Sequence, residues 1–113
     1  MSGSRVSTHV LDTALGRPAA DVGVILEAWG SGGWSELAAG RTGANGRVED
    51  LGPASAPAGT YRLRFDTGAY FAAAGTPAFF PEVTLTFAIV DDGEHYHVPL
   101  LISPFAYSTY RGN

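Results

Sequence analysis

The 113-residue chain contains neither cysteine nor lysine. Because it has no cysteine, disulfide bonds are excluded, which suits a reducing compartment such as the cytoplasm. All seven basic residues are arginines, and the net charge is −4. Nucleic-acid-binding proteins usually carry a basic patch, which an acidic chain with scattered arginines does not indicate. One or two well-placed arginines could still create a local positive site for a small anionic ligand.

Long apolar segments are also missing. No apolar run approaches the roughly 20 residues needed to span a bilayer, so no membrane partner is expected. The first twelve residues, MSGSRVSTHVLD, lack the apolar stretch of a secretion signal. With 45% hydrophobic residues and a mean hydropathy of +0.05, the composition is typical of a globular protein. We therefore expect a single domain over residues 1–113, located in the cytoplasm.

The sequence consists mainly of short segments in which apolar and polar residues alternate, separated by turn residues. Segments 5–12, 21–29, 34–42, 60–67, 82–90, 95–103 and 106–111 are interpreted as strands. Asn45 and Gly46 indicate a tight turn, residues 91–94 (DDGE) a second turn, and residues 51–59 (LGPASAPAG) a loop. Residues 68–75 are expected to form a short helix after a capping signal at Asp66 and Thr67. About eight short strands with one helix predict an all-β sandwich.

One face of the predicted sheet is unusual for a solvent-exposed surface. Segment 95–103 alternates between a core face and an outer face; the core face carries Tyr96, Val98, Leu100 and Ile102, and the outer face carries His95, His97, Pro99 and Leu101. The neighbouring strands would add further residues to the outer face, namely Ser7, His9, Leu11, Ser108 and Tyr110. A face that mixes leucines with histidines indicates an interface or a ligand surface. We expect this sheet to pack against a copy of itself and enclose a cleft, although a monomer with a few exposed leucines is an alternative.

His9, His97 and Arg47 are the first candidates for chemistry. A histidine side chain titrates near neutral pH, so two histidines on one face could supply a general base. Arg47 directly follows the Asn-Gly turn, from which its side chain could lean over the sheet edge. Each of the three, taken alone, could equally be a structural or surface residue. A three-histidine zinc site built from His9, His95 and His97 is a further alternative.

Four segments carry a family resemblance: STHVLDTALGRPAADVGVILE, NGR, YRLRFDTGAYFAAAGTPAFFPEVTLTF and HYHVPLLISPFAYSTYRGN. From Ser7 to the C-terminus they resemble 5-hydroxyisourate hydrolase, the transthyretin-related enzyme of urate breakdown. The most specific element is the terminal YRG followed by one small polar residue, because transthyretin lacks this ending. The resemblance implies a prealbumin/transthyretin-like sandwich of two four-stranded sheets with one short helix. It also implies a homotetramer, a dimer of dimers, with active sites in the channel where subunits meet.

The resemblance assigns roles to individual residues. The implied catalytic residues are His9, Arg47 and His97, and the implied substrate-binding residues are His9, Arg47, Ser108, Tyr110, Arg111, Gly112 and Asn113. Asn113 stands where the family has serine, and its amide can still donate or accept a hydrogen bond. The chain would end at this position because a longer tail would fill the cavity.

The implied reaction is hydrolysis of 5-hydroxyisourate to 2-oxo-4-hydroxy-4-carboxy-5-ureidoimidazoline, without a cofactor or a metal. His9 and His97 would orient and deprotonate the attacking water. Arg47 and Arg111 would hold the anionic ring, because a guanidinium matches planar acceptors, and Tyr110 would close the channel. The alternatives are a transthyretin-like carrier of a small ligand, which performs no catalysis, and a zinc-dependent hydrolase.

Overall fold

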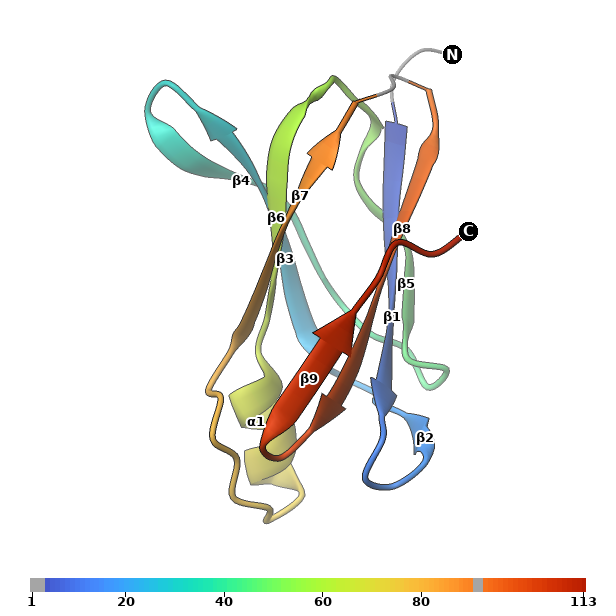
Figure 1. Cartoon of the computed structure of the whole chain (residues 1–113), viewed down its shortest axis with the longest axis vertical. Coiled ribbons are helices and arrows are strands. Elements are labelled where there is room, and N and C mark those ends of the chain that lie inside the picture. Colours follow the sequence, from blue (N-terminus) through green and yellow to red (C-terminus); the bar gives the residue numbers. More distant parts are fainter. Residues whose placement is uncertain (1–3, 91–92) are drawn as a thin grey trace.

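The protein is described here by a computed structural model, which covers residues 4–90 and 93–113. Of the turn predicted for residues 91–94, Asp91 and Asp92 lie outside the described residues, and Gly93 lies in a turn. Two layers of strands run along the long axis of a molecule measuring 42 × 29 × 20 Å, and the short helix α1 lies at one end of them (Figure 1). Within the described residues, no helix has the length and apolar character needed to cross a membrane.

The predicted sandwich of two sheets is confirmed. One sheet contains β1 (Ser4–Asp12), β2 (Arg17–Pro18), β5 (Arg47–Ala56), β8 (His95–Ser103) and β9 (Ala106–Thr109). Its order is β2-β1-β8-β9, with β5 also paired to β1. The other sheet has the order β4-β3-β6-β7 and contains β3 (Gly23–Gly30), β4 (Gly33–Arg41), β6 (Gly59–Phe65) and β7 (Val83–Ile89). The two-residue strand β2, where the sequence indicated only a break, makes the first sheet five-stranded instead of four-stranded.

The loop predicted for residues 51–59 is wrong over residues 51–56, and β6 already begins at Gly59. Strand β5 continues to Ala56, and Leu51 is buried in the core. Prolines and glycines in this segment suggested a loop because proline cannot donate a backbone hydrogen bond. Strand β5 accommodates Pro53 because it lies at the sheet edge and pairs only with β1, with register shifts on either side of Val6.

The core between the sheets is built from the alternating residues expected of a sandwich. Its largest fully buried side chains come from both layers, among them Leu26, Leu63, Phe65, Ile89, Leu100 and Ile102. Burial of each such side chain contributes about 1.5–3 kcal/mol. The predicted core face of β8 is confirmed, because all four of its members are buried. The opposite face of this strand therefore points away from the core.

Helix α1 (Thr67–Ala73) confirms the predicted short helix, starting one residue earlier than expected. The Asp66 carboxylate caps it by accepting a hydrogen bond of 3.2 Å from the Ala69 backbone N–H. Phe71 points into the core, and Gly75 follows the helix with a φ of 69°. The helix lies at one end of the sandwich (Figure 1).

Candidate active site

Strand β1 brings the candidate residues together because it pairs with β5 on one edge and with β8 on the other. His9 lies opposite Arg47 in the antiparallel pairing with β5. Ser7 lies opposite His97 in the parallel pairing with β8. Directly opposed residues share a face, and so do alternate residues of one strand. Ser7, His9, Arg47 and His97 therefore occupy one outer face of the sheet, from three strands that are distant in sequence.

The predicted turn at Asn45 and Gly46 is confirmed, and it holds β5 against β1. The Gly46 N–H donates to the Gly43 carbonyl over 2.9 Å, and the Gly46 carbonyl accepts from Val10 N over 2.7 Å. Gly46 has a φ of 77°, and a Cβ there would collide with the Val10 carbonyl oxygen and lie 3.3 Å from the His9 ring. Only glycine fits this position. The turn therefore delivers Arg47 to a place beside His9.

A hydroxyl group links the two histidines of β8. Ser7 Oγ lies 2.7 Å from His95 Nε2 and 2.8 Å from His97 Nδ1, both hydrogen-bond distances. Ser7 is 2% exposed, His97 is half-buried and His95 is exposed. The sequence placed Ser7 on the same face as His9 but assigned it no role. Its contact with both imidazoles follows from the parallel register of β1 and β8, which the sequence alone does not show.

The surroundings of His97 favour its neutral form. Burial lowers the pKa of the His97 imidazole below its ordinary value of 6.5, and the Arg47 guanidinium lowers this pKa further. Smaller contributions in the same direction come from His95 and His9, while Glu49 acts in the opposite direction. A neutral imidazole near pH 7 can accept a proton, which a general base requires.

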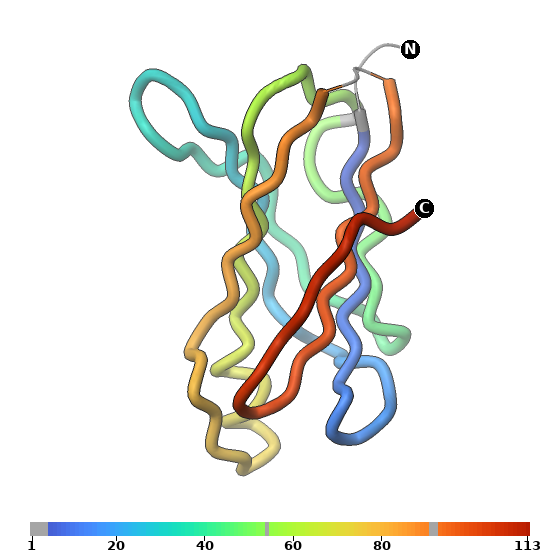
Figure 2. Tube along the Cα trace, in the orientation of Figure 1, coloured from blue at the N-terminus to red at the C-terminus, as the bar shows by residue number. Residues whose placement is uncertain are grey.

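The C-terminal tail continues alongside β8 (Figures 1 and 2). Gly112 pairs with His97 in an antiparallel bridge. Gly112 N–H donates to the His97 carbonyl over 2.8 Å. A Cβ at Gly112 would lie 2.6 Å from Cδ2 of the His97 ring, closer than real Cβ atoms approach. Glycine at this position therefore lets the tail backbone lie directly against the imidazole.

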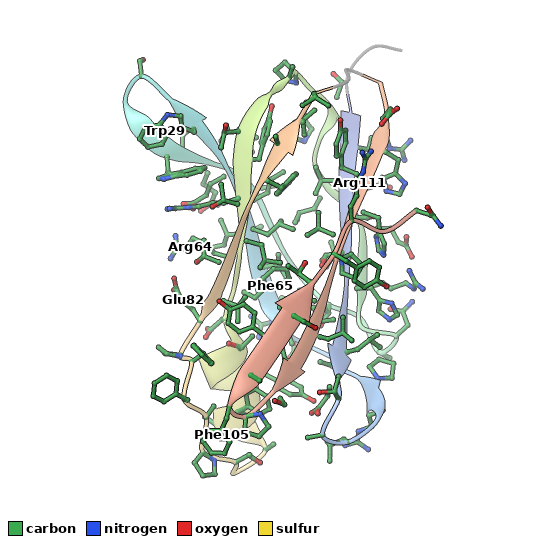
Figure 3. The ribbon with its side chains drawn as sticks, in the orientation of Figure 1. Trp29, Arg64, Phe65, Glu82, Phe105 and Arg111 are labelled. Atoms are coloured by element: carbon green, nitrogen blue, oxygen red, sulfur yellow. The ribbon has the colours of Figure 1, made fainter. Side chains whose placement is uncertain are left out.

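The other expected tail residues lie elsewhere in the single chain. The Arg111 guanidinium forms a 2.9 Å ion pair with Glu94 and lies 4.4 Å over the ring of Tyr96, on the core side of β8 (Figure 3). Tyr110 is 58% exposed, and with Arg111 it lines a groove of about 280 Å³ between β7 and β8. Ser108 lies opposite Leu101 on the outer face, and Asn113 is exposed. The structure thus gathers His9, Arg47, His97 and Gly112, but does not bring Tyr110 or Arg111 to them.

The described residues do not form the three-histidine zinc site. Ser7 lies between His95 and His97, whose ring centroids are 6.3 Å apart. Across residues 4–90 and 93–113, no group of three or more His, Cys, Asp or Glu side chains is arranged to hold a metal ion. His95 and His97 instead each direct a ring nitrogen at Ser7 Oγ.

Comparison with curated sequences gives close relatives over nearly the whole chain. The model of the HIUase/Transthyretin family matches residues 6–112. A 5-hydroxyisourate hydrolase of Salmonella dublin is 47% identical, covering 96% of this chain and 80% of the relative. A protein of the same name from Ralstonia nicotianae is 45% identical and covers 96% and 98% of the two chains.

Solved structures agree on the fold but differ in sequence identity. The 5-hydroxyisourate hydrolase of Klebsiella pneumoniae superposes with a TM-score of 0.88, at 42% identity, over 97% of this chain and 99% of that one. Transthyretin from Sparus aurata superposes with a TM-score of 0.90 at only 33% identity, over 96% of each chain. Backbone similarity does not separate the hydrolase from transthyretin, whereas sequence identity is higher for the hydrolase. On the family match and these relatives, the chain belongs to the HIUase/Transthyretin family.

Proposed function

We propose that this protein is a 5-hydroxyisourate hydrolase, which adds water to 5-hydroxyisourate and opens its six-membered ring in urate degradation. The product is 2-oxo-4-hydroxy-4-carboxy-5-ureidoimidazoline. The observation that carries the proposal is the convergence of His9, Arg47 and His97 on one outer face. The hydrolases of Salmonella dublin and Ralstonia nicotianae, which are more similar in sequence than transthyretin, support the same conclusion.

In the proposed mechanism, His97 is the general base. Its neutral imidazole takes a proton from water while the oxygen attacks a ring carbonyl, and His9 orients that water. Arg47 stabilises the negative charge that develops on the carbonyl oxygen, because a guanidinium donates to an oxyanion more strongly than neutral groups do. The protonated histidine then returns its proton to the ring nitrogen as the carbon–nitrogen bond breaks. These steps need no cofactor.

The remaining substrate-binding residues of the proposal have unequal support. Gly112 contacts His97, and Ser108 shares the outer face with Leu101. Tyr110, Arg111 and Asn113 would meet the substrate only in an assembly, where the tail of one subunit completes the channel. We therefore include in the proposal a homotetramer, a dimer of dimers, whose outer sheet faces pack around the cleft. The half-buried Leu11 and Leu101 support such packing, and sedimentation of an active monomer would contradict it.

The location and domain organisation belong to the same proposal. The whole chain would act as one hydrolase domain, and a cytoplasmic location fits its lack of cysteine. Fractionation of cells that produce the protein tests the location.

One experiment separates the proposed enzyme from its rivals. The ultraviolet absorbance of freshly made 5-hydroxyisourate is followed with protein, without protein, and with protein treated with chelator. We expect acceleration that survives chelation. Decay at the spontaneous rate would indicate a transthyretin-like carrier, and acceleration that disappears with chelator would indicate a metal-dependent hydrolase.

A further inference from the structure

The hydrogen bonds of Ser7 restrict where the protons of His95 and His97 lie. A hydroxyl has one proton to donate and lone pairs to accept with. Both imidazoles direct a nitrogen at Ser7 Oγ, at 2.7 and 2.8 Å. When both rings are neutral, Ser7 can donate to only one of them, so the other must donate its own N–H to Oγ. The protons of the three side chains are therefore coupled.

Only one of the two possible arrangements leaves His97 ready to act as a base. If His97 Nδ1–H donates to Ser7, then His97 Nε2 is unprotonated and Ser7 donates to His95 Nε2. In the opposite arrangement, His97 Nε2 already holds a proton and cannot take one from water. The orientation of a histidine by the partner of its second nitrogen is a general feature of histidine catalysis.

We propose that Ser7 is a positioning residue that holds His97 in the Nδ1–H tautomer and relays protons between His97 and His95. This inference rests on the proposed function, because it assigns to His97 the role of general base. Ser7 has no contact with substrate in this scheme and acts through His97. His95, which the sequence offered only as a possible metal ligand, becomes the solvent end of the relay.

The relay leads from the half-buried site to the surface. His95 is exposed and lines an open depression of about 410 Å³ together with Arg5, Glu49 and Asp50. Arg5 is held there by a 2.7 Å ion pair with Asp50. At the other end, His97 is influenced by His9, Arg47 and Glu49. Among the described residues, these charged and titratable groups lie on β1 and β5, beside the relay.

Each proton movement in the relay balances. As His97 Nε2 takes a proton from water, His97 Nδ1–H passes its proton to Ser7 Oγ. The original hydroxyl proton of Ser7 passes in turn to His95 Nε2. The net result is one hydroxide at the substrate, one cationic His95, and unchanged charge on His97 and Ser7. The relay resets when His97 Nε2 gives its proton to the leaving ring nitrogen while His95 Nε2 returns a proton to Ser7 Oγ and Ser7 passes its own to His97 Nδ1.

The first test does not need catalysis. Nitrogen NMR of the imidazole rings of the parental protein at about pH 8, above the ordinary range of histidine, should show His97 protonated on Nδ1. The same ring should show mixed tautomers in Ser7→Ala. A parental His97 protonated on Nε2 would overturn the proposal. If the parental protein failed to accelerate 5-hydroxyisourate decay, the proposed function would fail, and this spectrum would still decide the tautomer.

The second test uses the rate. In dilute buffer, Ser7→Ala should lower kcat by about tenfold to hundredfold, similar to the loss seen when a partner that orients a metal-bound histidine is removed, with KM little changed. Ser7→Thr keeps the hydroxyl and should stay close to the parental rate. His95→Gln should be slow in dilute buffer, and added imidazole should restore its rate because a soluble base replaces the relay end.

Thr8→Val is the matched control, because it removes a hydroxyl of the same strand that points into the core and donates to the Val98 carbonyl. It should keep the parental kcat per folded protein. Equal losses of kcat in Ser7→Ala and Ser7→Thr would overturn the relay. So would a His95→Gln rate that does not rise when imidazole is added. Thermal unfolding verifies folding of each variant; if Ser7→Ala does not fold, the parental spectrum and His95→Gln remain decisive.

Discussion

The outer faces of the two sheets both carry arginines, but the side chains that surround these arginines differ between the two faces. On the sheet β4-β3-β6-β7, the buried carboxylate of Glu27 accepts from Arg62 Nε at 2.5 Å and from Arg64 Nη1 at 3.2 Å. Arg64 also lies 3.8 Å from Glu82 (Figure 3). On the other sheet, Arg47 forms no side-chain ion pair with any residue that the structure describes, and the histidines are its neighbours.

This difference distinguishes a charge cluster that stabilises the fold from a cation that can take part in a reaction. The hydrogen bond from Arg62 lowers the pKa of Glu27, so the carboxylate stays ionised. Its negative charge is balanced by the arginines in direct contact with it. Arg62 also lies 4.1 Å over the Trp34 ring, which favours the cation further. Arg47 instead lowers the pKa of a neutral neighbour, His97. A cation without an acidic partner remains available to an anionic substrate.

The largest effect is expected from Arg47→Ala. Removal of one charge-stabilising donor typically costs about 10²–10³ in rate, and we expect a loss of this size in 5-hydroxyisourate hydrolysis. The fold should persist, because an exposed side chain contributes little to stability. The measurement is initial rate together with thermal unfolding. Near-parental activity in a folded variant would show that Arg47 is an ordinary surface charge.

The same substitution on the other sheet should have the opposite outcome. Arg62→Ala removes the first partner of a buried carboxylate, so the free energy of unfolding should fall by about 1.5–3 kcal/mol. The rate per folded molecule should be unchanged. Arg41→Ala is a suitable control, because its ion pair with Asp21 is exposed and exposed ion pairs contribute little to stability. Loss of rate without loss of stability in Arg62→Ala would contradict the structural role assigned to this arginine.

The contrast between the faces was only partly predictable from the sequence. Alternation in 95–103 separated buried Leu100 from His97 correctly, because strand periodicity depends on neighbouring residues alone. It could not show that Glu27 would lie beside Arg62, since this pairing depends on the register between strands. The hydrogen bonds of Ser7 could not be predicted from the sequence for the same reason. Pairing across β1 and β8 joins residues about 90 positions apart.

The tail shows a second limit of the sequence. Its motif indicated that the last four residues belong to the site, and Gly112 does contact His97. The motif could not show that Arg111 would pair with Glu94 in the single chain. That contact depends on how the tail leaves β9, where regular pairing has ended at Thr109. Local patterns therefore predicted the elements, while contacts beyond them required the folded chain.

A smaller effect is expected in the pH dependence. Hydrolysis needs neutral His97, so kcat/KM should fall as pH drops through its pKa, which lies below 6.5. Arg47→Gln removes a cation that lowers this pKa, so the pKa should rise toward its ordinary value. Burial is the larger cause and remains, which limits the shift. NMR titration of the His97 ring measures it directly, with Arg62→Ala as the unshifted control. An unchanged pKa in Arg47→Gln would show that Arg47 does not act on His97.

The smallest effect is expected at the chain end, where Asn113 stands at the position at which the family resemblance implies a serine. Asn113 is exposed, and its amide can donate or accept a hydrogen bond as a hydroxyl does. If the last residue only binds substrate, Asn113→Ser should change the rate by a small factor. If a terminal hydroxyl moved a proton in the reaction, restoring it should raise the rate by something nearer the ~10²–10⁴ that positioned proton transfer supplies. We expect the small change, because His97, Ser7 and His95 already form a proton path on the outer face. Single-turnover rates of the two proteins decide between these outcomes. A large gain on restoring serine would place proton transfer at the tail, and His97 would then not be the sole base.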